Sequence, residues 1–332
     1  MKGFIRRQIQ NTLACPPVLS AIQGVRHPNA ISIFGYNGLI NRPLPVSDWC
    51  FIDTEAFRQQ IAYLSKTFEL ISLPEALNLM SHKKLRGRKA VITFDDGFQS
   101  VKDIALPILQ EYSAPATIYL TGELADKARS AWFTRIILAL SHTRVQEVRW
   151  QGNAYPLASA EQKSRLSQLI QHHLQQVTDV QIQAALSAFE TSLKVEVNPE
   201  IEAGSPFKIL DRATISAMNN HPLITWGAHL RSHEVLSKLA DSEKNDQIKH
   251  AISAVKDLTG GDCRHFAYPG GRLQASDNSS PRLLTEAGVI SSVTMNPGPV
   301  TTDTPLLHLN RYSVGASTTF SRFKLMAHHI GR

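Results

Sequence analysis

The chain has 332 residues, a formal net charge of +7 at pH 7 and a hydrophobic content of 42%. This composition is ample for a folded core and argues against a disordered or fibrous chain. Three widely spaced cysteines are too few for a disulfide scaffold, and no apolar run is long enough for a transmembrane helix.

Strand-like and helix-like segments alternate along the chain, which predicts an α/β fold. The predicted strands are short, apolar and bounded by turn signals. They span residues 30–34, 69–72, 90–94, 116–120, 223–227, 265–268 and 289–295. Helical patterns fill the intervals between them. In one such interval, Ser280-Pro281 predicts the start of a helix and Gly288 predicts its end.

A cluster of basic residues, Lys83 to Lys89, precedes the third predicted strand. We interpret it as a solvated loop, with steering of anionic sugars or contact with a membrane surface as the alternative. The cluster lacks interleaved aromatic residues and no nucleic-acid motif accompanies it, so we expect no nucleic-acid partner. Cys15-Pro16-Pro17 interrupts the apolar stretch near the N-terminus, so we expect no signal peptide and a cytoplasmic protein, with peripheral membrane contact left open.

Two adjacent carboxylates, Asp95 and Asp96, follow the predicted strand that ends at Phe94. Like charges repel at the poorly solvated end of a buried strand, and a cation or a shared proton relieves that repulsion. The pair therefore indicates a metal site, a proton-transfer site or both. The alternative is a plain strand-terminating turn at Asp95-Asp96-Gly97.

Residues 125–207 break the alternation of strands and helices. The sequence there predicts a helix at 131–140, a hairpin around Gly152-Asn153, and two helices near 161–176 and 180–193. We expect an insertion on the main fold. Its aromatic residues, such as Trp132 and Trp150, are expected in the core of the insertion, with a glycan cleft as the alternative.

His229 and His233 follow the predicted strand at 223–227. Two histidines four residues apart share one face of a helical turn and can converge on one ion. In α/β folds, ligand sites collect at the carboxyl ends of strands, where both this pair and the Asp pair are expected. One Asp with two His leaves coordination positions open for water and substrate.

A third motif, Tyr268-Pro269-Gly270-Gly271, takes a short predicted strand into a turn. The glycines let a ligand approach the backbone closely, and the proline stiffens the turn. On local grounds, an ordinary turn is an equal alternative.

In this order and at these separations, the three motifs resemble those of the polysaccharide deacetylase (NodB-homology) superfamily, which is similar to carbohydrate esterase family four. The resemblance is to the branch that de-N-acetylates exopolysaccharides, and it extends to Leu309-Asn310-Arg311-Tyr312. It implies an irregular (β/α)7-type barrel with a mostly helical insertion. We expect the chain to divide into an N-terminal extension (1–30), the barrel (31–124 and 208–320), the insertion (125–207) and a C-terminal tail (321–332).

The resemblance also implies roles for individual residues. Asp96, His229 and His233 would hold one divalent ion, zinc by ligand type. Asp95 would be the general base, and Arg311 would hold it ionised, with a surface salt bridge as the alternative for Arg311. Substrate contacts are expected from Asn37, Tyr268, Pro269 and Gly270, with the Tyr268 backbone N–H at the oxyanion.

One departure from the family pattern concerns the general acid. Members of this branch carry Tyr-His at the end of the first strand, whereas this chain has Tyr36-Asn37, and an amide cannot donate a proton as imidazolium does. His308 is the nearest substitute by sequence, and His265 is the second. We expect a metal-dependent hydrolase that removes an N-acetyl group from an amino sugar in a polysaccharide, oligosaccharide or lipid-linked glycan. The alternative is a catalytically impaired glycan-binding relative that keeps the metal site.

Overall fold

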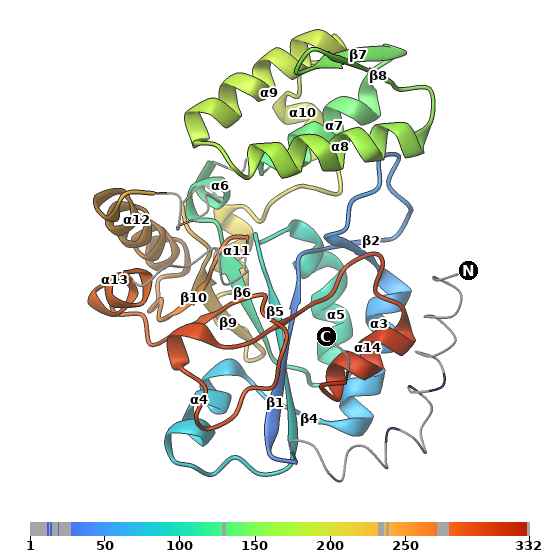
Figure 1. Cartoon of the computed structure of the whole chain (residues 1–332). Coiled ribbons are helices and arrows are strands. Elements are labelled where there is room, and N and C mark those ends of the chain that lie inside the picture. The colour runs from blue at the N-terminus through green and yellow to red at the C-terminus, as the bar shows by residue number, and fades with distance from the viewer. Residues whose placement is uncertain are drawn as a thin grey trace.

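The computed structural model describes residues 28–127, 131–231, 236, 239–270 and 279–330, together with residues 12, 14 and 19. Its main element is a sheet with the strand order β11-β10-β9-β6-β5-β1-β12, beside which β4 pairs with β5 (Figure 1). All strand pairs in this sheet are parallel. The strands are β1 (Ala30–Tyr36), β4 (Glu69–Leu70), β5 (Arg88–Phe94), β6 (Ala116–Leu120), β9 (Ile224–Ala228), β10 (His265–Ala267), β11 (Ser291–Val293) and β12 (Tyr312–Ser313).

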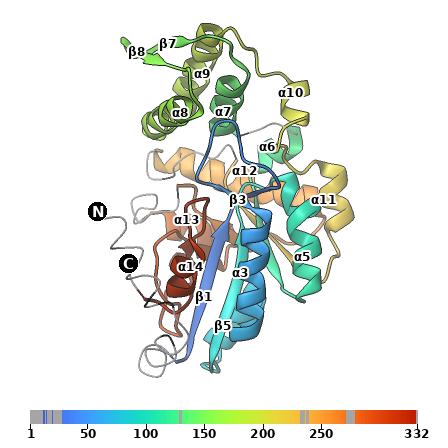
Figure 2. The same ribbon diagram turned by 90° about the vertical axis from the view of Figure 1, so that its right-hand side faces the viewer.

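Helices pack around the outside of the curled sheet (Figure 2). They are α3 (Thr54–Thr67), α4 (Leu73–Ser81), α5 (Leu106–Glu111), α6 (Gly122–Lys127), α11 (Arg212–Met218), α12 (Asp241–Thr259), α13 (Ser280–Glu286) and α14 (Phe320–Ala327). Helix α3 shows why these segments are helical. The Asp53 side chain caps its first turn, and Phe57, Ile61 and Leu64 recur at helical spacing on its buried face.

The segment 309–313 brings the two edges of the sheet together. Leu309 forms a parallel bridge with Val293 at the end of β11, and Tyr312 pairs with Phe34 in β1. The sheet thereby curls into an irregular α/β barrel, as predicted. Arg311 lies between these two pairings, so its side chain is fixed at the seam of the barrel.

The seven predicted strands are all present, with ends shifted by a few residues. The additional strands β2 (Gly38–Ile40), β3 (Phe51–Asp53) and β12 have only two or three residues each. Segments this short show no periodicity in sequence, and their pairing partners are distant along the chain. The helix predicted to start at Ser280 has its N-cap one residue earlier, at Ser279.

Between β6 and β9 the chain forms a separate group of elements. These are α7 (Trp132–His142), the hairpin β7 (Glu147–Trp150) and β8 (Asn153–Pro156), α8 (Ala160–Leu174), α9 (Asp179–Leu193) and α10 (Pro199–Ala203). Strands β6 and β9 pair directly, so the chain leaves and re-enters the sheet at neighbouring strands. Figures 1 and 2 show α7, α8 and α9 above the end of the sheet at which β1 gives way to β2.

The aromatic residues of this group lie in its own core. Trp132 and Phe133 are 6% and 7% exposed, and the Trp150 ring packs edge-on against Phe189. The expectation that they are core residues is confirmed for Trp132 and Phe133, and Trp150 packs partly buried against that core. No helix in the described part of the chain is long and apolar enough to cross a membrane.

Candidate active site

Asp95 and Arg311 form a buried ion pair at the carboxyl end of β5. Arg311 Nη1 and Nη2 donate to Asp95 Oδ1 and Oδ2, each at 2.7 Å. The side chains are 0% and 4% exposed, so each charge depends on the other for compensation. This fork geometry fixes the plane of the carboxylate as well as its charge. Arg311 is thus no surface salt bridge, and the alternative expected from sequence is wrong.

Other groups fix the Arg311 side chain in the seam. Arg311 Nε donates to the Thr294 carbonyl at 3.1 Å, and Nη1 also donates to Thr93 Oγ1 at 3.0 Å. Gly35 makes room for the guanidinium, because a Cβ at that position would lie 2.9 Å from Arg311 Nε. Contacts with β1, β5 and the turn after β11 therefore hold Arg311 in position beside Asp95.

Asp96 is fully buried and has a left-handed backbone conformation, with φ of 67°. This conformation is unusual for a residue with a side chain. Asn37 Nδ2 donates to Asp96 Oδ2 at 2.7 Å. Asn37 therefore lies beside the carboxylate pair and its amide orients Asp96, while the substrate contact expected of it stays a prediction.

The second oxygen of Asp96 faces His229. His229 Nδ1 lies 2.8 Å from the Ala267 carbonyl, which can only accept, so Nδ1 carries the hydrogen. The remaining nitrogen, Nε2, lies 3.7 Å from Asp96 Oδ1, and both side chains are buried. With its hydrogen on Nδ1, the ring turns Nε2 toward the Asp96 carboxylate, an arrangement in which both atoms could bind one cation.

This donor set fits a metal ion. Two ligands about 2.0–2.2 Å from one zinc ion lie roughly 3.3–3.6 Å apart at a tetrahedral angle, close to the 3.7 Å between His229 Nε2 and Asp96 Oδ1. The Ala267 carbonyl fixes the His229 ring, and the Asn37 amide fixes the Asp96 carboxylate, as outer partners of metal ligands do. His233, the third predicted ligand, lies outside the described residues. Within those residues, no three His, Cys, Asp or Glu side chains are grouped for an ion.

Tyr268, the residue after Ala267, packs against the segment that precedes Arg311. Its hydroxyl donates to the Leu307 carbonyl at 3.2 Å, and its ring stacks on His308 with centroids 5.8 Å apart. The Tyr268 N–H donates to the Val293 carbonyl at 3.2 Å, because the pairing of β10 with β11 extends one residue further. That donor is engaged within the protein, so the oxyanion role expected for it is not supported. Pro269 is buried and Gly270 is exposed with φ of 72°; their substrate contacts stay a prediction.

The two histidines considered as the acid differ in position. His265 is 6% exposed at the amino end of β10, and burial lowers its pKa to about 4. It belongs to the core at the far end of the strand from Asp95. His308 is partly buried against Tyr268, and this desolvation lowers its pKa from the ordinary value. His308 therefore stays the predicted acid, with a smaller protonated fraction at neutral pH than a free histidine.

The basic cluster at 83–89 lies at the opposite end of β5 from the two aspartates. Five strand residues lie between Lys89, the last residue of the cluster, and Asp95, a span of about 20 Å. Lys89 pairs with Glu69, and the Arg88 guanidinium lies over the Phe68 ring. This position favours the interpretation as a solvated loop over steering of a substrate to the site.

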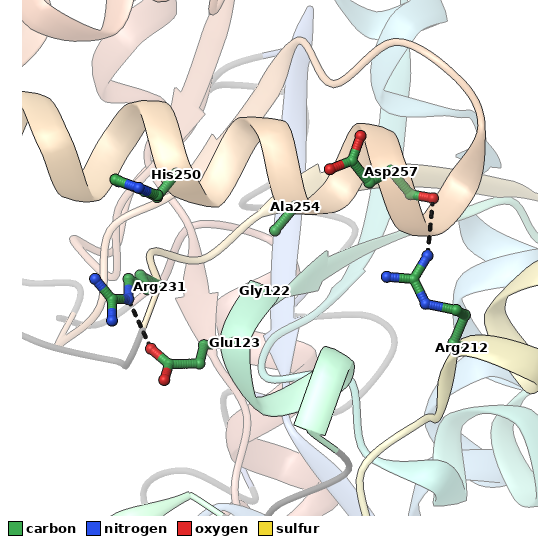
Figure 3. Close-up of a pocket in the computed structure, with 7 residues that line it drawn as sticks. All are labelled: Gly122, Glu123, Arg212, Arg231, His250, Ala254 and Asp257. Atoms are coloured by element: carbon green, nitrogen blue, oxygen red, sulfur yellow. Dashed lines mark hydrogen bonds and ion pairs between the residues drawn. The ribbon is translucent and has the colours of Figure 1, made fainter.

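A pocket of about 200 Å³ lies beside the segment that follows His229 (Figure 3). Its lining contains none of the predicted site residues; it consists of Gly122, Glu123, Arg212, Arg231, His250, Ala254 and Asp257. Arg231 Nε donates to Glu123 Oε2 at 2.7 Å, and the Glu123 N–H donates to the Arg231 carbonyl. These contacts tie the start of α6 to the segment after His229, which is a structural role.

Two residues that hold the site, Thr93 and Ala267, were not predicted from the sequence. Thr93 Oγ1 joins Arg311 to the Phe34 carbonyl, and the Ala267 carbonyl sets the tautomer of His229. Thr93 gave a weak signal, as a hydroxyl in an otherwise apolar strand. Ala267 gave none, because it acts through its backbone.

The fold and the site together define a hydrolase of the α/β barrel class, with a charged carboxylate beside an Asp–His pair at the carboxyl ends of parallel strands. The chain belongs to the polysaccharide deacetylase family, whose pattern matches residues 82–289, more than half of the chain. It is thus a hydrolase acting on carbon–nitrogen bonds of acylated glycans.

Comparison with solved structures shows the same fold. The chain is similar to the Streptococcus pyogenes deacetylase PplD in complex with acetate, with TM-score 0.59 and 15% identity over 90% of this chain and 99% of that one. It is also similar to IcaB from Ammonifex degensii, with TM-score 0.58 and 16% identity over 90% and 97% of the two chains. A search of curated proteins gave no match.

Proposed function

We propose that this protein is a metal-dependent N-deacetylase that removes an acetyl group from an amino sugar within a polysaccharide, oligosaccharide or lipid-linked glycan. One observation carries the proposal. Asp96 Oδ1 and His229 Nε2 face each other at 3.7 Å, next to a carboxylate that a buried arginine holds in place. Family membership supports the deacetylase chemistry, and this geometry supports the metal.

Asp96 and His229 would hold the ion, with His233 as the third ligand and zinc as the metal favoured by this ligand type. When bound, such an ion polarises the acyl carbonyl and lowers the pKa of a bound water.

Asp95 is placed to take the proton of the attacking water. Each of its oxygens accepts a hydrogen bond from Arg311, which fixes the carboxylate in one orientation. As the water oxygen bonds to the acyl carbon, its proton passes to Asp95. Arg311 then remains as a fixed positive charge beside the neutral carboxyl, and the frame of Thr93 and Thr294 prevents its movement.

The leaving nitrogen must gain a proton when the C–N bond breaks. Asn37 cannot supply it, because an amide holds its hydrogens and one of them already bonds Asp96. His308 is our proposed donor. It is the histidine nearest in sequence to Arg311, and its ring stacks on Tyr268, the residue after Ala267.

The second candidate function, glycan binding without turnover, rests on Asn37 alone. The Asp95–Arg311 and Asp96–His229 pairs keep the arrangement that hydrolysis needs, so the geometry favours the enzyme.

The test is acetate release from a panel of N-acetylated oligosaccharides, polysaccharides and lipid-linked amino sugars, together with elemental analysis of the purified protein. We expect about one divalent ion per chain and turnover on at least one class. Glycan binding with a full metal complement and no acetate release from any substrate would favour the second candidate.

A further inference from the structure

We propose that the indole of Trp49 is a stacking platform for a neighbouring sugar unit of the glycan, on the rim of the deacetylase site. The inference rests on the proposed function and adds a binding subsite to it. Four observations carry it: the exposure of the ring, the rigidity of its support, its position relative to Asn37, and the chemistry of an aromatic face.

Trp49 is 49% exposed. The other tryptophans are Trp132 and Trp226, which are buried at 6% and 7%, and Trp150, which packs against Phe189. Burying an indole stabilises a fold by several kcal/mol, so a half-exposed one forgoes part of that free energy. Single exposed apolar residues are common on protein surfaces, and exposure alone therefore proves nothing.

The support of Trp49 is what distinguishes it from a chance exposed residue. The Ala316 N–H donates to the Trp49 carbonyl at 2.8 Å. Gly315 lies directly against the same residue, because a Cβ there would be 2.2 Å from the Trp49 oxygen and 3.1 Å from its ring atom Cε3. A larger residue at 315 would displace the indole. The ring therefore rests on a glycine that leaves it no freedom on that side.

The preceding residues fix the loop from the other side. Asp48 accepts hydrogen bonds from the Cys50 N–H and from Gln171 Nε2 of α8, at 3.1 and 2.8 Å. The Ser47 N–H donates to Ser164 Oγ of α8 at 2.9 Å. An exposed side chain on such a fixed loop loses little conformational entropy when it binds a ligand. This is the behaviour of a preformed contact.

Two backbone hydrogen bonds place Trp49 at the site. The Gly38 N–H, next to Asn37, donates to the Cys50 carbonyl at 3.2 Å. On the other side, the Val314 N–H donates to the Gly35 carbonyl at 2.9 Å, and Gly315 follows. Adding the spacing of consecutive Cα atoms to that of paired chains puts Trp49 roughly 13 Å or less from Asn37. A glycan of a few units spans that distance.

The chemistry selects a sugar as the occupant. One face of a pyranose ring presents C–H groups, which pack on the electron-rich face of an indole, while the hydroxyls at the ring edge stay hydrated. Binding sites commonly combine one such aromatic surface with a few polar groups that fix orientation. Here the polar groups are those around Asp95 and Asp96.

The experiment titrates a β-linked N-acetylglucosamine pentasaccharide, and separately the free monosaccharide, into Asp95→Asn protein while tryptophan emission is recorded. Turnover is suppressed in this background, and Trp49 is the exposed emitter. We expect the pentasaccharide to change the emission, and Trp49→Ala in the same background to weaken its binding about tenfold or more, measured by calorimetry. Trp49→Phe should retain most of the affinity, and monosaccharide binding should not depend on Trp49.

The matched control is Ile290→Ala, which removes another exposed apolar side chain, 45% exposed, next to the amino end of β11. It should leave pentasaccharide binding unchanged.

Equal pentasaccharide affinity in Trp49→Ala and the parent overturns the proposal, as does the absence of any binding to the parent. Loss of binding to anionic phospholipid vesicles, with glycan affinity intact, would assign Trp49 to a membrane surface instead. Trp49-dependent glycan binding without acetate release from the wild-type protein would refute the proposed function and leave this subsite standing.

Discussion

Two arginine–aspartate pairs stand at opposite ends of the sheet. Arg264 and Asp262 lie before β10, with side chains 59% and 61% exposed and a contact of 2.8 Å. Arg311 and Asp95 lie at the carboxyl ends of the strands, with 0% and 4% exposure and contacts of 2.7 Å. The two pairs have the same residue types, but the first is exposed to solvent and the second is buried.

The difference in exposure changes what each pair contributes to stability. An exposed pair is screened by water and contributes at most about 1 kcal/mol to stability. A buried pair carries a desolvation cost of several kcal/mol per ion, and an apolar replacement would often be as stable. The buried pair is the one to which we assign a role in the proposed reaction, and the following variants test that contrast.

The largest effect is expected from Asp95→Asn. The amide cannot accept the proton of the attacking water, so turnover should fall by about 10²–10⁴-fold. Metal content, measured by elemental analysis, should not change. The matched control is Asp262→Asn at the exposed pair, which should keep turnover within about twofold. Activity of Asp95→Asn within a few-fold of wild type would remove Asp95 from the mechanism.

The next effect concerns stability. Arg311→Leu leaves the Asp95 charge buried without its partner, and we expect a loss of about 3–5 kcal/mol in the free energy of unfolding. Arg264→Leu should cost about 1 kcal/mol or less. Urea denaturation of both variants at pH 7 gives the comparison. Equal losses in the two variants would mean that burial does not change what such a pair contributes to the free energy of unfolding.

A third test uses pH at the exposed end. Burial lowers the pKa of His265, the residue after Arg264, to about 4, whereas an unfolded histidine titrates near 6.5. Between these values the unfolded chain binds the proton and the folded chain does not, so stability falls as pH decreases from about 6.5 to 4. The full effect of this one group is up to about 3 kcal/mol.

His265→Gln should reduce this pH dependence, measured by urea denaturation at intervals between pH 7 and 4. Burial also lowers the pKa of His328 to about 4, so part of the slope should remain in that variant. His82→Gln, at an exposed position, is the control. An unchanged slope in His265→Gln would show that His265 is protonated in the folded chain.

A smaller effect is expected from Asn37→Ala. Asn37 orients Asp96 through a 2.7 Å hydrogen bond, and removing such a partner of a metal ligand typically weakens metal affinity about 10–100-fold. Competition with a zinc chelator measures this directly and without turnover. An affinity equal to that of the wild type would show that Asp96 keeps its orientation without the amide.

Asn37→His tests the missing acid. If an imidazole at this position protonates the leaving amine, turnover should rise about tenfold or more at constant metal content. If His308 already does so, Asn37→His should change little and His308→Ala should abolish activity. Should neither variant alter turnover, both acid assignments would be wrong.

The sequence predicted much of this molecule because several signals were local. The strand that ends at Phe94 and the carboxylates that follow it are adjacent in the chain, so their type and order could be read directly. The general rule for α/β folds then predicted that Asp96 and His229 lie at the same end of the sheet, and the structure brings them to 3.7 Å. The residues that act through backbone atoms, such as Ala267, gave no signal at all.

By itself, the sequence determined the class of fold, the two adjacent carboxylates that follow a strand and the absence of the usual histidine at position 37, because each depends on residue type and short-range order. The tertiary structure alone decided how those residues are held. Whether Arg311 is a surface charge or the buried partner of Asp95 depends on the seam between β11 and β1, where residues far apart along the chain are brought together. The tautomer of His229, the engaged N–H of Tyr268 and the fixed rim around Trp49 arise from the same cause. Hydrogen bonds between distant segments set them, and no local pattern of side chains encodes such contacts.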